Sequence, residues 1–213
     1  MASPGQLVQT MAAALGISVA TVAQYDRQLS EKGLRSKGGR GSSAATVTAH
    51  DAANLLIAIL AGPTVKEAAR TCEMYGSLKA NGKGSFANRF PQFGLRSLAE
   101  LPKRHSFQEA LSTLIDAAAR GEDFTIPDER EPISADSFFG IQIVGPRPWA
   151  EISADGSVGK GKGRPMAKLV YAQEWSAWRG DLYQSRHVSF YQSRHVTFAT
   201  VRALGSLLAG KLP

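Results

Sequence analysis

The apolar residues of the N-terminal part follow the spacing of amphipathic helices. They recur at intervals of four or seven residues, at Leu7, Met11, Leu15, Val22 and Leu29. A nearly continuous apolar run follows at 49–60, with Thr48 as a candidate N-cap and Gly62-Pro63 as a stop. Further helices are predicted from Val65 to about Tyr75 and from Phe107 to Arg120, separated by a loop at 76–94.

The pattern changes after residue 136. Residues 138–144 alternate between polar and apolar positions, and 148–153 and 167–172 are further short apolar segments. They predict an antiparallel meander. Helical spacing returns near the C-terminus, at Phe198, Val201, Leu204 and Leu208. The predicted fold class is therefore α+β, with N-terminal helices, a small antiparallel sheet and a C-terminal helix.

An acidic segment lies between these two patterns. Residues 121–136 contain one basic and six acidic residues, a net charge of −5, together with two prolines. We interpret this segment as a linker between a helical region at 1–120 and a region at 137–213. The second region is expected to oligomerise or to bind a partner.

Charge and cysteine content narrow the class of protein. The net charge of +7 favours an anionic partner, of which nucleic acid is the commonest. Residues 1–60 contribute +2, 61–120 contribute +4 and 137–213 contribute +6. The single cysteine, Cys72, is read as a core residue and fits a reducing compartment. No apolar run has the roughly 18 residues of a membrane span, and no secretory signal is visible, so a cytoplasmic, nucleoid-associated protein without membrane contact is expected.

Residues 7–30 match the requirements of a helix-turn-helix. Ala12 is a small residue in the first helix, and Gly16 suits the turn because it tolerates positive φ. Ser18 is a candidate N-cap of the second helix, with Val22 and Tyr25 as inward anchors. The spacing therefore predicts a recognition helix at 18–30.

The other face of that helix and the segment after it supply candidate DNA contacts. The outward positions carry short hydroxyls, carboxamides and a guanidinium suited to base edges and phosphates: Ser18, Ala20, Thr21, Gln24, Arg27 and Gln28. A glycine-rich basic wing is predicted at about 33–47. Its candidate phosphate contacts are Arg35, Lys37, Arg40 and Ser42.

These features resemble the winged helix-turn-helix and MerR-like DNA-binding domains. The resemblance rests on Ala12, Gly16, Ile17, Val22 and Tyr25, and on the Lys32-Gly33-Leu34 that ends the helix before the basic loop. MerR-like wings usually contain aromatic residues, which this one lacks. The segments 48–58 and 145–150 are similar to small regulators of alphaproteobacterial phages and gene-transfer agents. The resemblance implies double-stranded DNA as the partner.

Two further segments are unusual. Residues 81–90 mix basic and aromatic side chains, which suits either a loop pinned to the core by Phe86, Phe90 and Phe93 or a single-strand contact. Residues 183–198 are a tandem repeat, in which YQSRHVSF is followed directly by YQSRHVTF. One copy is expected to lead into the final helix, with Thr197 as its cap, and the other to form an extra strand or a bulged loop.

No catalytic set, cofactor motif or metal-ligand cluster is recognised in the sequence. The first hypothesis is a sequence-specific transcription regulator, a homodimer whose C-terminal region pairs subunits or contacts a second regulatory protein or RNA polymerase. The alternative is a phage DNA-packaging recognition subunit similar to a small terminase, which would form a ring. We expect the chain not to be an enzyme.

Overall fold

The computed structural model describes residues 2–36, 46–62, 64–81, 86–125, 139–145, 148–155, 166–172 and 192–211. The helical elements are α1 (Pro4–Leu15), α2 (Val19–Glu31), α3 (Ala49–Ala61), the short 3-10 helix η2 (Val65–Glu67), α4 (Ala68–Gly76), the 3-10 helix η3 (Ala87–Phe93), α5 (Arg96–Ala99), α6 (Phe107–Ala119) and α8 (Phe198–Leu208). The strands are β1 (Ala80–Asn81), β2 (Phe139–Gly145), β3 (Trp149–Asp155), β4 (Met166–Ala172) and β5 (Gln192–Val196).

Side-chain caps define where the main helices begin. The hydroxyls of Ser3, Ser18, Thr48 and Ser106 each accept a hydrogen bond from a backbone N–H of the first turn. Three of these helices also have the reciprocal capping box, in which the acid or amide three residues later bonds back to the cap. The caps predicted at Ser18 and Thr48 are thus confirmed. The side chain of Thr197, at the start of α8, makes no such bond.

The strands form one antiparallel sheet in the order β1-β4-β3-β2-β5. The central three are the predicted meander, and the α+β class is confirmed. The edge strand β5 comes from the second copy of the tandem repeat, which also leads into α8, while the first copy lies outside the described residues. The prediction of a loop at 76–94 was incomplete, because this region contains the short strand β1 and the 3-10 helix η3.

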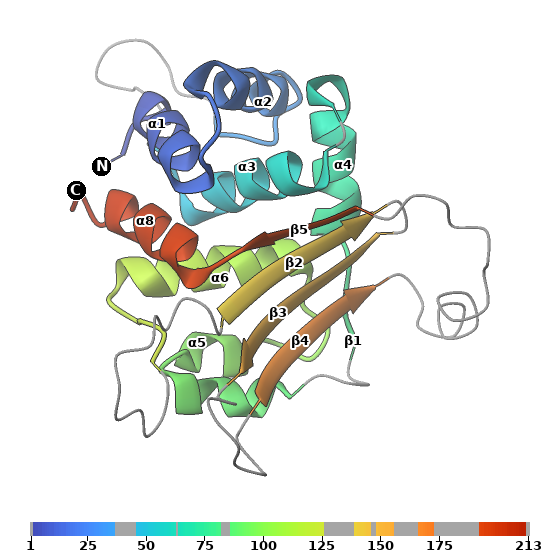
Figure 1. Ribbon diagram of the computed structural model, residues 1–213, viewed down its shortest axis with the longest axis vertical. Coiled ribbons are helices and arrows are strands. Elements are labelled where there is room, and N and C mark those ends of the chain that lie inside the picture. Colours follow the sequence, from blue (N-terminus) through green and yellow to red (C-terminus); the bar gives the residue numbers. More distant parts are fainter. Residues whose placement is uncertain are drawn as a thin grey trace.

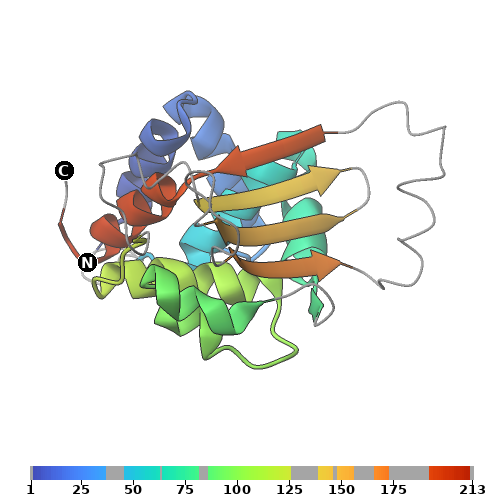
Figure 2. The same ribbon diagram turned by 60° about the horizontal axis from the view of Figure 1, so that its bottom comes forward.

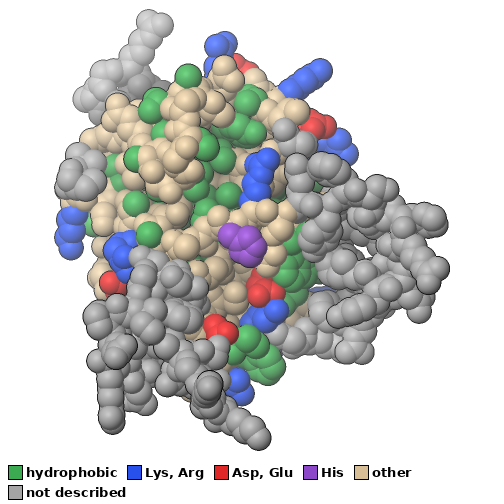
Figure 3. All heavy atoms as spheres, in the orientation of Figure 1, with side chains coloured by type: hydrophobic (Ala, Val, Ile, Leu, Met, Phe, Trp, Pro, Cys, Tyr) green, Lys and Arg blue, Asp and Glu red, His purple; other side chains and the backbone are tan. Residues whose placement is uncertain are grey.

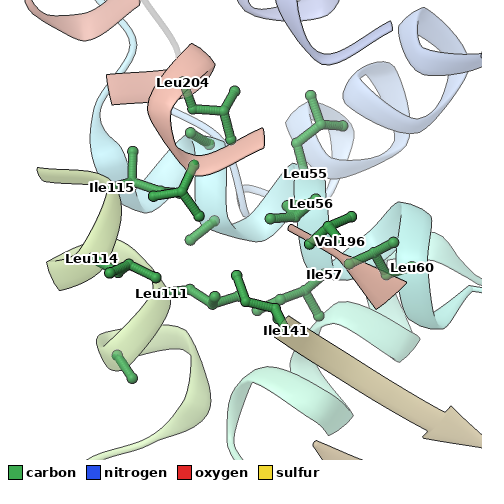
Figure 4. Packing of buried hydrophobic residues seen from close by; sticks show 14 of the residues in the cluster. Leu55, Leu56, Ile57, Leu60, Leu111, Leu114, Ile115, Ile141, Val196 and Leu204 are labelled. Carbon is green, nitrogen blue, oxygen red and sulfur yellow. The ribbon is translucent and has the colours of Figure 1, made fainter. Parts of the chain in front are cut away.

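One face of the sheet packs on a layer of helices (Figures 1 and 2). Helix α3 lies at the centre of this layer, and its residues from Asp51 to Leu60 are all buried. Figure 4 shows leucine and isoleucine side chains of α3 and α6 meeting Ile141 of β2, Val196 of β5 and Leu204 of α8. Full burial of each such side chain contributes about 1.5–3 kcal/mol, so this contact layer is the main source of stability.

The residues before and after the predicted linker share one hydrophobic core. Helix α8 lies beside α1 and α6 (Figure 1). Gly205 allows the close approach to α6, because a Cβ there would lie 2.7 Å from the Cβ of Ala118. The sequence-based boundary at 121–136 therefore marks the change from helices to strands, and its role as a linker stays a prediction.

Three polar contacts also join the helices to the sheet. The Tyr75 hydroxyl donates to the carbonyl of Val144 (2.8 Å). Nη1 of Arg194 donates to the carbonyl of Ile59 (2.6 Å). The third joins Nε2 of His105 to the hydroxyl of Tyr171 (2.8 Å). Among the described residues, no helix has the length and apolar character needed to cross a bilayer.

Candidate nucleic-acid interface

A tight turn at Gly16 joins α1 to α2. Gly16 has φ of 65°, in the left-handed region that glycine adopts without strain. The next residue closes the turn, because the N–H of Ile17 donates to the carbonyl of Ala12 (3.1 Å). The turn lies at the residue that the sequence predicted, and it sets the direction in which α2 leaves α1.

Helix α2 is held by one apolar face. Val22 and Leu29 are fully buried, and Tyr25 is buried with its hydroxyl donating to the carbonyl of Gly62 (3.4 Å). Gly62 is the C-cap of α3, so Tyr25 attaches the middle of α2 to the end of the central helix. These contacts fix which side of α2 faces outward.

The predicted reading face of α2 is accessible. Ser18, Ala20, Thr21, Gln24 and Arg27 are exposed, and Gln28 is half-buried. Val19, in the same first turn, is 51% exposed, the largest value among the large apolar side chains of the described residues.

Glu31 organises part of this face. Its carboxylate accepts from Nε of Arg27 (2.8 Å) and from Nε2 of Gln28 (3.4 Å). The side chains of Arg27 and Glu31 are 77% and 49% exposed. An exposed pair one helical turn apart is weak. Phosphate or a base edge can therefore replace Glu31 as the partner of Arg27.

The structure does not place Arg35 on this accessible face. Its Nε lies 2.7 Å from Oδ1 of Asp26, and the two side chains are only 14% and 11% exposed. Burial raises the pKa of Asp26; the charge of Arg35 opposes this shift and that of Asp51 adds to it. The role of Arg35 as a DNA contact was predicted from its charge alone and does not fit this buried pairing. We therefore assign Arg35 to the support of α2.

The two ends of the predicted wing meet at Asp51. Its Oδ1 accepts from the N–H of Ser36 (2.7 Å), and its Oδ2 accepts from the N–H (2.9 Å) and the hydroxyl (2.7 Å) of Thr48. Burial would raise the pKa of Asp51, but these hydrogen bonds outweigh it and hold the pKa below its usual value. One carboxylate thus fastens the chain on both sides of the glycine-rich segment. Lys37, Arg40 and Ser42 lie between these ends and outside the described residues.

Two more hydrogen bonds fix the ends of the segment. Nδ2 of Asn54 donates to the carbonyl of Leu34 (2.7 Å), and the N–H of Val47 donates to the carbonyl of Ala2 (2.9 Å). Asp51 forms the capping box of α3 with Thr48. Its second partner, Ser36, lies fifteen residues earlier, a separation for which the sequence gives no pattern.

The described part of the chain offers no candidate metal site. It contains no group of three or more His, Cys, Asp or Glu side chains that could hold a metal ion. Cys72 is buried, as predicted, and burial, aided by the charge of Glu73, raises the pKa of its thiol to about 12. Figure 3 shows the Lys and Arg side chains on the face of Figure 1 scattered singly rather than gathered over α1 and α2.

Comparison of the chain with protein-family models, curated proteins and solved structures finds no match.

Proposed function

We propose that the chain is a sequence-specific DNA-binding transcription regulator of the phage or mobile-element type. The observation that carries this proposal is the orientation of α2: Val22, Tyr25 and Leu29 bind it to the body, while Thr21, Gln24 and Arg27 are exposed. A helix held by one face and lined on the other with short polar side chains and a guanidinium suits the major groove.

In this proposal α2 reads the base edges. The Gln24 carboxamide can form two hydrogen bonds with adenine, and the Arg27 guanidinium can do so with guanine. The methyl group of Thr21 suits a thymine methyl. Each good bidentate contact contributes about 1–3 kcal/mol of discrimination against the wrong base.

The glycine-rich segment would contact the flanking backbone. Lys37 and Arg40 supply the cations, and Asp51 keeps both ends of the segment attached to α3. A homodimer would double the site that a single helix reads, and RNA polymerase or a second regulator would be the further partner. The homodimer and the further partner stay predictions. The mass of the protein in solution tests the first, and co-purification with polymerase tests the second.

The test is selection of genomic fragments by the protein, followed by affinity measurement with three substitutions in α2, Thr21→Ala, Gln24→Ala and Arg27→Ala. We expect specific binding to fall by at least tenfold while weak binding to unrelated duplex remains. A matched control carries Thr113→Ala, Gln92→Ala and Arg120→Ala, because Arg120 also pairs with an acid one helical turn away, Asp116. If the α2 variant keeps its sequence preference, the proposal is wrong.

A further inference from the structure

A group of cations without ion pairs in the described part of the chain lies away from α2. Five exposed basic side chains belong to the segments around η3, α5 and the start of α6: Lys79, Arg89, Arg96, Lys103 and Arg104. We call this set the lower basic surface, because these elements lie at the bottom of Figure 1, whereas α1 and α2 lie at the top. Figure 2 shows the same separation.

Tertiary contacts bring part of this set together. Lys79 forms an isolated β-bridge with Ser106, and the N–H of the next residue, Ala80, donates to the carbonyl of His105 (2.9 Å). Lys103 and Arg104 directly precede His105. Three cations from two distant parts of the sequence therefore surround the start of α6.

Arg89, in η3, is exposed, and contacts with Phe86 and β4 hold its side chain in place. Its guanidinium carbon lies 4.9 Å from the ring centroid of Phe86, which is 39% exposed. Its Nη1 is 3.5 Å from the carbonyl of Met166, and the N–H of Phe86 donates to the carbonyl of Lys168 (2.7 Å). Cation–π stacking and these backbone contacts position the guanidinium before any ligand arrives, which lowers the entropy lost on binding.

The positive charge of this surface is partly compensated by nearby acids. None of the five cations forms an ion pair within the part of the chain that the structure describes, whereas Arg27 and Arg35 beside the reading face are both paired. The acids around it are Glu100, Glu109, whose charge interacts with that of Lys79, and Glu122, whose carboxylate accepts from the N–H and the hydroxyl of Ser97. The five cations outnumber these three acids.

We propose that the lower basic surface binds the phosphate backbone of a second duplex DNA segment, so that one molecule bridges two segments. The bridging rests on the proposed function of α2 for the first segment, but binding at the lower surface does not. Duplex DNA is stiff over about 150 base pairs. A duplex lying along α2 therefore does not bend round to the opposite end of the same molecule, and the lower cations meet a different segment.

The experiment compares Lys103→Ala/Arg104→Ala with a control of equal charge loss, Arg120→Ala/Lys211→Ala. Binding to a labelled 30-base-pair duplex of unrelated sequence is measured as a function of salt. Each lost phosphate contact lowers the slope of log affinity against log salt by about 0.9, so we expect a decrease of about two units in the first variant and a smaller one in the control. Circular dichroism melting verifies that both variants fold.

Bridging is tested with an immobilised duplex carrying the selected sequence. The wild-type protein should capture the labelled second duplex, and Lys103→Ala/Arg104→Ala should bind the immobilised duplex without capturing the second. An unchanged salt slope overturns the proposal, as does tighter binding to oligo(dT) or to a polyglutamate peptide than to duplex. Loss of sequence preference in the α2 variant, with an unchanged salt slope on the unrelated duplex, supports both proposals. Retention of that preference refutes the reading role of α2, and with it the bridging, while the salt slope still tests the lower surface.

Discussion

Asp51→Asn probes the attachment of the glycine-rich segment with the smallest change in shape. The carboxylate accepts three hydrogen bonds, one on Oδ1 from Ser36 and two on Oδ2 from Thr48. An asparagine amide has one oxygen and an NH₂ group, so if its oxygen faces Thr48, its NH₂ group opposes the N–H of Ser36. A hydrogen bond to a charged group contributes about 1.5–3 kcal/mol, and one between neutral groups about 1 kcal/mol. Loss of one bond and weakening of two give a decrease of about 3 kcal/mol in the free energy of unfolding.

The pH dependence of this effect has a defined sign. The pKa of Asp51 is lower in the folded protein than its usual value of 3.8. The carboxylate therefore stabilises the fold fully at pH values well above 3.8, and this contribution is lost as the pH falls through the folded pKa. Because asparagine does not titrate, the difference between wild type and variant should be constant from pH 7 to about 5 and should narrow below about pH 4.

The assay is urea unfolding at several pH values between 7 and 3, with Asp116→Asn as the control. Asp116 is an exposed acid that pairs with Arg120 one turn away, and its replacement should cost less than about 0.5 kcal/mol. An Asp51→Asn variant as stable as wild type at pH 7 would refute the assignment of Asp51 as the shared anchor. A stability difference that does not change with pH would refute the charged state of the carboxylate as its cause.

Three further substitutions test the joints between helices and sheet, each by urea unfolding. Gly205→Ala should destabilise by about 1–3 kcal/mol, because its methyl group would lie 2.7 Å from the Cβ of Ala118; Gly5→Ala, at an exposed helical position of α1 where a Cβ meets nothing within 4 Å, separates this clash from the effect of replacing a helical glycine. Arg194→Met keeps the aliphatic stem but removes the hydrogen bond to the Ile59 carbonyl, and should destabilise by about 1.5–3 kcal/mol; an unchanged midpoint would show that this contact contributes nothing. Burial lowers the pKa of His105 below 6.5, so the stability that neutral His105 contributes is present above about pH 6.5 and is lost as the pH falls through the folded pKa. Wild type should therefore lose more stability than His105→Gln between pH 7 and 5, and equal losses would contradict this reasoning.

The sequence predicted the local features of the fold well because these depend on neighbouring residues. The caps at Ser18 and Thr48 and the turn at Gly16 follow from side-chain chemistry within a few positions. The accessible face of α2 follows from a periodicity of 3.6 residues, which places Val22 and Leu29 inside.

What the sequence did not show are contacts between distant residues. Arg35 was assigned to DNA because a sequence shows its charge but not the buried carboxylate of Asp26 beside it. The lower basic surface was visible only as the net charge of +4 in residues 61–120. Its partial clustering depends on the bridge between Lys79 and Ser106, which forms only when the chain folds. Of the three aromatic residues considered as anchors of the loop at 81–90, Phe90 and Phe93 are fully buried in the core, whereas Phe86 is exposed.

The tandem repeat shows that the sequence of a strand alone does not determine which copy of the repeat pairs with β2. In the second copy, Arg194 donates to the end of α3, and Val196 and Phe198 enter the core. The first copy has the same three residue types at Arg186, Val188 and Phe190, so its strand residues would suit the position beside β2 equally well.

The residues that follow each copy make the difference. After the second copy, α8 places Val201, Leu204 and Leu207 in the core. A shift by eight residues would put Ser193, Val196 and Ala199 at these positions. It would also put Thr197 at the position of Gly205, where even a Cβ would lie within 3 Å of Ala118. Replacing leucine with alanine in a core costs about 2–5 kcal/mol, and the clash and the buried hydroxyl add to that cost. Helix α8 therefore determines which copy becomes β5, and the strand itself does not.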